Sequence, residues 1–182
     1  EYLEFVTPAD MQRIKAMEII PSIRPEVTLT DKLILNETIK PENGQNLGLW
    51  SNLLKQNNII ISGTDFPYHT INPLVVMYYL SSGLSVDTAA NRLTNNTAQK
   101  LSVLDALKSF TVYSAFASFA EEVKGTLEKD KFADMVVLSD DIVASDPAVL
   151  LKAKILMTII RGEVVYENKS PGALLYEYDL KL

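Results

Sequence analysis

Short apolar runs alternate with amphipathic stretches through the first part of the chain. Residues 59–61 are three consecutive isoleucines, a β-branched run typical of a strand that is buried on both faces. Residues 1–6 and 19–23 are two further candidate strands, and residues 47–56 place apolar side chains at helical spacing. Strands that alternate with helices predict an α/β fold with a parallel sheet.

Three predicted helices begin at a residue whose side-chain oxygen can cap the first helical turn. These residues are Thr7, Asn72 and Ser102. Thr7 and Ser102 each have an aspartate three residues later, a spacing that resembles a capping box. Proline directly follows Thr7 and Asn72, at the first helical position, where it is well tolerated. The apolar periodicity over residues 101–117 predicts the best-defined helix of the chain.

The pattern changes after Gly125, where β-branched residues become frequent. Residues 133–138 form one candidate strand. Residues 155–160 and 163–166 predict a hairpin whose turn is Arg161-Gly162, with the glycine supplying a positive φ. These strands are antiparallel in character, unlike those of the preceding segment.

Length and charge limit the classes of protein to consider. A chain of 182 residues is long enough for one domain or one and a half, and we divide it at residues 1–122 and 123–182. The net charge of −6 argues against a nucleic-acid partner or an anionic membrane surface. The lack of cysteine excludes disulfides and thiolate metal sites. No apolar stretch is long enough to span a bilayer, and we predict a cytoplasmic location.

One carboxylate directly follows the buried isoleucine run. In the segment S-G-T-D-F-P, residues 62–67, Asp65 stands where the strand has ended, and Pro67 prevents further pairing. The carboxyl ends of strands are where α/β barrels carry their catalytic residues. Aspartate is also a common turn residue, so the pattern alone leaves a catalytic and a purely structural interpretation open.

Three segments resemble the amidohydrolase superfamily. Residues 124–138, K-G-T-L-E-K-D-K-F-A-D-M-V-V-L, are similar to the family segment G-[ST]-[LI]-E-x-G-K-x-A-D-[LFM]-V-V-L, although Asp130 replaces a glycine. Residues 160–166 resemble V-x-G-x-x-V-Y, and residues 62–67 resemble the G-[ST]-D-[WF]-P that ends the eighth barrel strand. Over residues 1–167 the chain looks like the carboxyl half of the branch with exoenzyme-like metal-dependent hydrolases and N-substituted formamide deformylases.

The resemblance implies a fold and a chemistry. The fold would be a partial (β/α)8 TIM barrel with part of a small, composite β-sandwich domain. The activity would be hydrolysis of non-peptide C–N bonds in amides or cyclic amides, with a divalent metal ion, zinc by expectation, activating the water. Asp65 matches the family aspartate that ligates the metal or shuttles the proton of the water, so it is the predicted catalytic and metal-binding residue.

Two other residues are candidates for binding a small-molecule substrate. Arg24 follows the second predicted strand and would lie at the mouth of the barrel, where it could bind a carboxylate or an oxyanion. His69, the only histidine, lies four residues past Asp65, although a solvated loop histidine is the more ordinary interpretation. The polar stretch 87–100 is interpreted as a lid or a surface loop.

Tyr2 is the main departure from the family pattern. It stands where the family has a ligand histidine, and a phenol is a poor replacement for imidazole. We therefore expect this chain to bind no metal tightly by itself. It would be either the carboxyl part of a hydrolase or a catalytically inactive binding or structural module.

Barrel closure also bears on the partners of the chain. Three parallel strands cannot close a barrel, and their edges would present unpaired backbone groups. The start at Glu1-Tyr2-Leu3, without methionine or a basic segment, suggests a fragment. We expect the chain to contact a missing amino-terminal half or to form a homo-oligomer.

Overall fold

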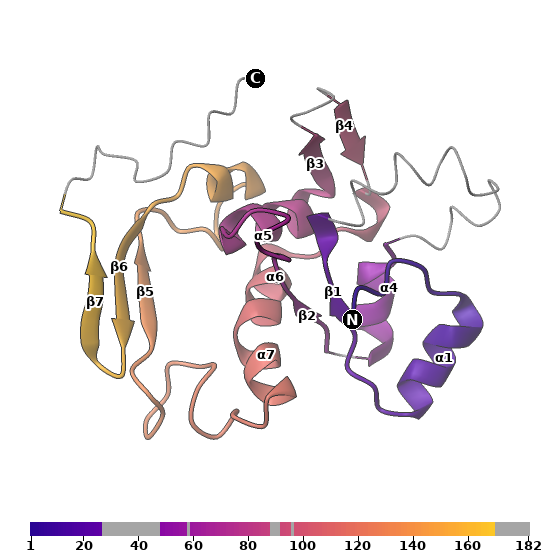
Figure 1. Ribbon diagram of the computed structural model, residues 1–182, viewed down its shortest axis with the longest axis horizontal. Coiled ribbons are helices and arrows are strands. Elements are labelled where there is room, and N and C mark those ends of the chain that lie inside the picture. The colour runs from indigo at the N-terminus through magenta and orange to yellow at the C-terminus, as the bar shows by residue number, and fades with distance from the viewer. Residues whose placement is uncertain (27–47, 58, 88–91, 96, 170–182) are drawn as a thin grey trace.

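The computed structural model describes residues 1–26, 48–57, 59–87, 92–95 and 97–169 (Figure 1). Helices and strands are mixed along the chain, and β5, β6 and β7 lie on the opposite side of the molecule from α1 and α4. The elements are α1 (Pro8–Ala16), β1 (Ser22–Ile23), α4 (Trp50–Asn57), β2 (Ile61–Ser62), α5 (Pro73–Ser82), β3 (Leu84–Asp87), β4 (Arg92–Asn95), η1 (Thr97–Gln99), α6 (Val103–Phe110), α7 (Val112–Ala117), β5 (Met135–Leu138), η2 (Pro147–Leu151), β6 (Ile155–Ile160) and β7 (Glu163–Glu167).

The two short strands β1 and β2 pair in parallel, as the alternating pattern predicts. Ser22 pairs with Ile61, and Ile23 pairs with Ser62. Both strands lie at the carboxyl ends of the predicted segments 19–23 and 59–61. Helix α4 begins at Trp50 within the predicted helix 47–56 and contributes to the packing below these strands. Parallel pairing puts the residues that follow the two strands at the same end of the sheet.

The predicted strand over residues 1–6 is wrong. In this segment Phe5 makes only an isolated bridge. Tyr2 and Leu3 have positive φ angles of 64° and 46°, and the Leu3 N–H donates to the Glu1 carbonyl at 2.9 Å. This backbone is a turn, and left-handed residues cannot continue an extended ladder. The turn rather than a strand therefore sets the direction of the Tyr2 side chain.

The predicted N-caps are confirmed. Side-chain oxygens of Thr7, Asn72 and Ser102 accept backbone N–H groups at 3.2, 3.0 and 3.0 Å. The helix predicted over 101–117 is two helices, α6 and α7, because Thr111 leaves the helical backbone with φ −121° and ψ −96°. The Thr111 hydroxyl donates to the Leu107 carbonyl at 2.9 Å, a local bond that competes with helix continuation.

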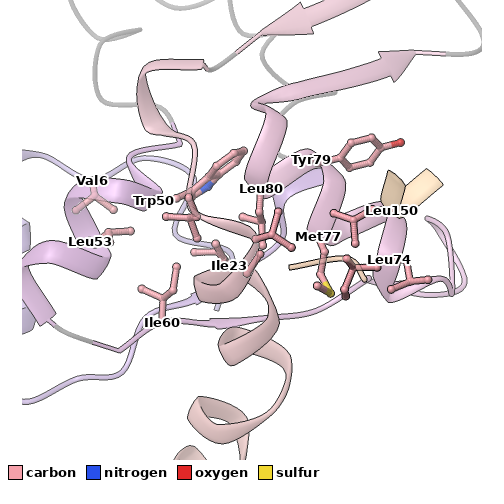
Figure 2. Close-up of a cluster of buried hydrophobic side chains, with 14 of the residues drawn as sticks. Val6, Ile23, Trp50, Leu53, Ile60, Leu74, Met77, Tyr79, Leu80 and Leu150 are labelled. Carbon is pink, nitrogen blue, oxygen red and sulfur yellow. The ribbon is translucent and has the colours of Figure 1, made fainter. Parts of the chain in front are cut away.

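The hydrophobic core lies between α4, the ends of β1 and β2, and α5 (Figure 2). Trp50 is fully buried in this core. Helix α5 packs against α6 and η2, and Leu150 of η2 joins the same cluster. Residues on both sides of the predicted boundary at 122 share this core, and the boundary remains a prediction.

Residues 84–87 and 92–95 are strands, β3 and β4. Strands β3 and β4 are antiparallel, and Asp87 pairs with Arg92 in their register. The interpretation of residues 87–100 as a loop is therefore wrong for these strands. Each strand is only four residues long, so the alternation of Leu84 and Val86 with polar residues is too short to have identified β3. Within the described part of the chain, none of the helices is both long and apolar enough to cross a membrane.

The carboxyl-terminal sheet has the order β5-β6-β7 and is antiparallel, as predicted. Ile160 pairs with Glu163, so Arg161 and Gly162 form a two-residue turn with φ angles of 51° and 83°. The Arg161 N–H donates to Asp134 Oδ1 at 2.8 Å. Two left-handed residues in succession fit the right-handed twist of a hairpin, which explains the glycine.

Candidate active site

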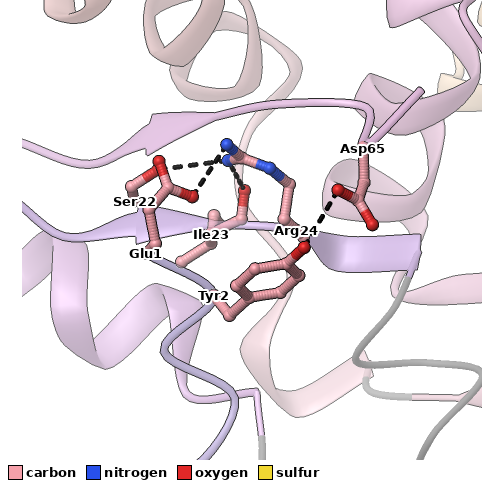
Figure 3. Close-up of polar contacts among 6 residues, drawn as sticks. All are labelled: Glu1, Tyr2, Ser22, Ile23, Arg24 and Asp65. Carbon is pink, nitrogen blue, oxygen red and sulfur yellow. Dashed lines mark hydrogen bonds and ion pairs between the residues drawn. The ribbon is translucent and has the colours of Figure 1, made fainter. Parts of the chain in front are cut away.

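The candidate site lies at the adjoining carboxyl ends of β1 and β2 (Figure 3). Arg24 directly follows β1, and Asp65 lies three residues after β2. Tyr2 enters from the amino-terminal turn. Parallel pairing of β1 and β2 therefore brings Arg24 and Asp65 to the same end of the sheet, the end at which α/β barrels carry catalytic residues. Their position at a strand end does not identify the residues that contact them.

Asp65 is half-buried and accepts a hydrogen bond from the Tyr2 hydroxyl at 3.0 Å. Its backbone has φ 56°, and its carbonyl accepts the Tyr68 N–H at 3.1 Å, so Asp65 also forms a turn. The hydrogen bond to Asp65 is the main cause that raises the pKa of Tyr2 above that of an ordinary phenol, and desolvation is the next largest cause. Tyr2 consequently remains protonated and able to donate at neutral pH.

Three of the neighbours that hold the Arg24 guanidinium are Glu1, Ser22 and Ile23. Its Nη2 lies 2.8 Å from Glu1 Oε2, and Nη1 donates to Ser22 Oγ at 3.1 Å and to the Ile23 carbonyl at 2.9 Å. The side chain is only 19% exposed. Its Cζ lies 6.0 Å from the centre of the Tyr2 ring. These contacts give Arg24 a structural function, and its predicted substrate contact remains a prediction.

Gly63 provides the space for this guanidinium. A Cβ atom on Gly63 would lie 2.7 Å from Arg24 Cζ. The glycine in the G-T-D segment is therefore explained by close packing, because any larger residue would displace the guanidinium.

His69 is not the solvated loop residue of the ordinary interpretation. Its side chain is 21% exposed, and Nδ1 lies 3.8 Å from Glu26 Oε1. Glu26 Oε2 also accepts the Thr70 N–H at 3.4 Å. Burial raises the pKa of Glu26, and the His69 charge and the Thr70 N–H oppose that effect. Glu26 thus connects the end of β1 to the loop that carries Asp65, while the predicted substrate contact of His69 remains a prediction.

Three residues that contact the candidate site are not identified by the sequence pattern: Glu1, Ser22 and Glu26. Ser22 lies in β1, and Glu26 lies three residues after this strand. Closeness to a strand end is therefore the signal that could have identified these two residues. Glu1 lies 21 residues from its partner Ser22, and only the turn at the amino terminus brings them together. Side-chain pairing over such distances depends on packing that periodicity does not encode.

The described residues do not fit a metal site. No group of three or more His, Cys, Asp or Glu residues among them could hold a metal ion. Asp65 follows β2, and its observed side-chain partner is a hydrogen-bond donor rather than a second ligand.

Comparisons with known proteins place the chain in a wider context. A family model described as "Amidohydrolase family" matches residues 1–166. The chain is 26% identical over 166 residues to "Putative amidohydrolase YtcJ" of Bacillus subtilis (strain 168), covering 87% of this chain and 30% of that protein. It is 27% identical over 176 residues to "Protein LONG AFTER FAR-RED 3" of Arabidopsis thaliana, covering 91% of this chain and 28% of that protein.

A solved structure has a similar fold. It is that of an uncharacterized metal-dependent hydrolase from Pyrococcus horikoshii OT3, with a TM-score of 0.66 and 21% sequence identity. The match covers 81% of this chain and 29% of the other. The likeness concerns the fold. The chain spans less than a third of the length of the curated relatives it matches.

Proposed function

Because the chain belongs to the Amidohydrolase family, we propose that Asp65 is the catalytic carboxylate of a hydrolase. The substrate would be a small molecule with a non-peptide C–N bond, in an amide or a cyclic amide. The observation that carries this proposal is the position of Asp65 beside Arg24, at the carboxyl ends of two parallel strands. That end of a parallel sheet is where α/β enzymes assemble their active sites.

The fold that supports this proposal would be part of a (β/α)8 barrel, followed by part of a β-sandwich domain. The parallel pair β1-β2 and the separate antiparallel sheet β5-β6-β7 agree with such a division. The relatives are more than three times as long as the matched segment, so a complete barrel would need further strands. These would come from an amino-terminal half or from a second copy of the chain.

Asp65 would act as a proton carrier. Its carboxylate would take a proton from the attacking water as the new C–O bond forms at the carbonyl carbon. A proton would be returned to the departing nitrogen as the C–N bond breaks. The metal-binding function predicted for Asp65, with zinc as the expected ion, would require ligands beyond the described residues.

A second candidate function is an inactive binding or structural module. The observation behind it is Tyr2, which stands where the family pattern has a ligand histidine and donates its hydroxyl to Asp65. In that case, the chain would retain its fold and bind small molecules without turnover.

The test is an assay of the protein expressed from its complete reading frame, with linear and cyclic amides as substrates and release of amine as the readout. Asp65→Asn should lower kcat by at least about 100-fold, because a proton-transferring group is removed. Asp130→Asn is the matched control, since Asp130 is another turn aspartate with a positive φ, 71°. Elemental analysis of both samples measures bound zinc.

The outcomes separate the two candidates. Turnover that Asp65→Asn abolishes and Asp130→Asn preserves supports the hydrolase. Turnover that survives in Asp65→Asn contradicts the proposed role of this carboxylate. If no amide is hydrolysed and no zinc is found, the inactive module is the better account.

A further inference from the structure

Tyr2 brings a second exchangeable proton to the site. Its hydroxyl lies 3.0 Å from Asp65 Oδ1, and the residue is 41% exposed. Asp65 is half-buried, so the phenol is the more accessible member of the pair. The function proposed for Asp65 does not use this hydroxyl. A group this close to the proton carrier and open to solvent can reach both the carboxylate and a bound substrate.

The amino-terminal turn holds the Tyr2 side chain against Asp65. On one side, Glu1 contacts Arg24 at 2.8 Å and accepts from the Ser22 hydroxyl at 3.1 Å. On the other side, the Leu3 N–H donates back to the Glu1 carbonyl at 2.9 Å. Tyr2 itself has φ 64°, a left-handed conformation that surrounding contacts must maintain. Figure 3 shows the Tyr2 ring near Arg24, with its hydroxyl pointing towards Asp65. The placement is therefore built by several contacts rather than by one.

We propose that Tyr2 is a second catalytic residue, which protonates the departing nitrogen and then recovers a proton from Asp65. This inference rests on the proposed function. The water gives one proton to the Asp65 carboxylate, and its oxygen forms the C–O bond. As the C–N bond breaks, the nitrogen takes the phenolic proton of Tyr2. The Asp65 proton then passes to the Tyr2 oxygen along the observed hydrogen bond. Water has been added across the C–N bond, and both residues return to their starting states.

The chemistry of a phenol suits this step. A phenol carries its proton throughout the neutral range, and the Tyr2 hydroxyl already donates to Asp65 Oδ1 at 3.0 Å. The departing amine nitrogen is a strong enough base to accept it. Division of the two proton transfers between two residues removes the need for one carboxylate to reach both the water and the nitrogen.

The test compares two leaving groups on the same acyl compound, an alkylamide and a p-nitroanilide. An electron-poor anilide leaves with little help from an acid, whereas an alkylamine needs protonation. Tyr2→Phe should lower kcat about 100-fold for the alkylamide. It should change the p-nitroanilide rate less than about threefold, with KM nearly constant for both. Tyr68→Phe is the control, because Tyr68 is 85% exposed on the loop after Asp65.

The activity that Tyr2→Phe loses on each substrate shows which of the two proposals fails. An equal loss on both substrates would give Tyr2 a structural function only, and the proposed function of Asp65 would stand. Full activity of Tyr2→Phe on the alkylamide would overturn the inference in the same way. If the unmodified protein hydrolyses neither substrate, both proposals fall.

A second measurement does not depend on activity. The protein labelled with 3-fluorotyrosine is examined by ¹⁹F NMR at neutral pH, and the Tyr2 signal is assigned by its loss in Tyr2→Phe. Asp65→Asn should shift that signal, because the Tyr2 hydroxyl loses the charged carboxylate that accepts its hydrogen bond at 3.0 Å. An unshifted signal would mean that the two groups are not in contact, and the inference would fail.

Discussion

At the residue scale, Gly63 determines where the Arg24 guanidinium can lie. A methyl group at this position would come within 2.7 Å of Arg24 Cζ. Gly63→Ala should therefore push the guanidinium away from Glu1 and Ser22. Because the displaced group is the end of a flexible side chain, we expect a loss of about 1 kcal/mol of unfolding free energy rather than misfolding.

Urea unfolding measures this loss, and a double-mutant cycle with Arg24→Ala identifies its cause. If Arg24 is the group displaced, Gly63→Ala should have almost no effect in the Arg24→Ala background. An equal loss in both backgrounds would point to the backbone of Gly63 instead.

The pair of Tyr2 and Asp65 predicts a pH dependence of stability. The pKa of Tyr2 is raised above its ordinary value of 10.0, chiefly by the hydrogen bond to Asp65. The stabilisation from this contact is present below pH 10 and is lost as the pH rises through the raised pKa. The difference in unfolding free energy between the protein and Tyr2→Phe should therefore shrink at alkaline pH. Urea titrations from about pH 8 to about pH 12 measure it, and a constant difference would contradict the contact.

Only part of the site could be predicted at this scale. Asp65 and Arg24 are found from sequence because strands end just before them, and parallel pairing brings those ends together. The contact between Tyr2 and Asp65 could not be predicted, since it depends on a left-handed turn in a segment that we expected to be a strand. His69 was identified as a candidate, but its partner Glu26 comes from another strand end.

At the element scale, the local rules were the most reliable. Each of the three N-caps, at Thr7, Asn72 and Ser102, is confirmed, because a capping bond depends only on residues that adjoin the helix. The hairpin β6-β7 is confirmed for the same reason. The segment 101–117 shows the limit, since the apolar face continues through Thr111 while the backbone does not.

The hairpin turn gives a prediction with a single physical cause. Gly162 has φ 83°, and an added Cβ would meet Ala133 Cβ only at 4.0 Å. Gly162→Ala should therefore cost about 1–2 kcal/mol of stability from backbone strain alone, since no steric overlap contributes. Thermal or urea unfolding measures the change.

A matched substitution in the same turn tests that cause. Arg161→Asn should relieve strain, because asparagine tolerates the φ of 51° observed there, while the contact of Arg161 with the Phe132 ring at 4.6 Å is lost. We expect these effects to offset each other and leave stability nearly unchanged. A loss as large as that of Gly162→Ala would show that backbone strain is not what limits the stability of this turn.

At the scale of the whole molecule, the matched relatives are much longer than the chain. Part of the exposed apolar surface of the chain lies on one face of the sheet β5-β6-β7. Cross-strand partners point to the same face of a sheet, so Val137 and Met157 share a face with Ile159 and Val164. Val137 is 44% exposed and Val164 is 54% exposed. Such a face, together with the edges of β1-β2, is expected to be covered by another part of the protein or by a second copy.

This surface predicts that the 182-residue chain, purified alone, is not a monomer at micromolar concentration. Light scattering after size-exclusion chromatography measures its mass. The double substitution Val137→Lys with Val164→Lys should increase the monomer fraction, because two charges on one apolar face oppose its burial. Val123→Lys is the control, since Val123 is 41% exposed but lies outside the sheet. A monomer before any substitution would contradict the prediction. Association that both variants preserve would assign the contact to the β1-β2 edges, where backbone groups rather than side chains would make the interface.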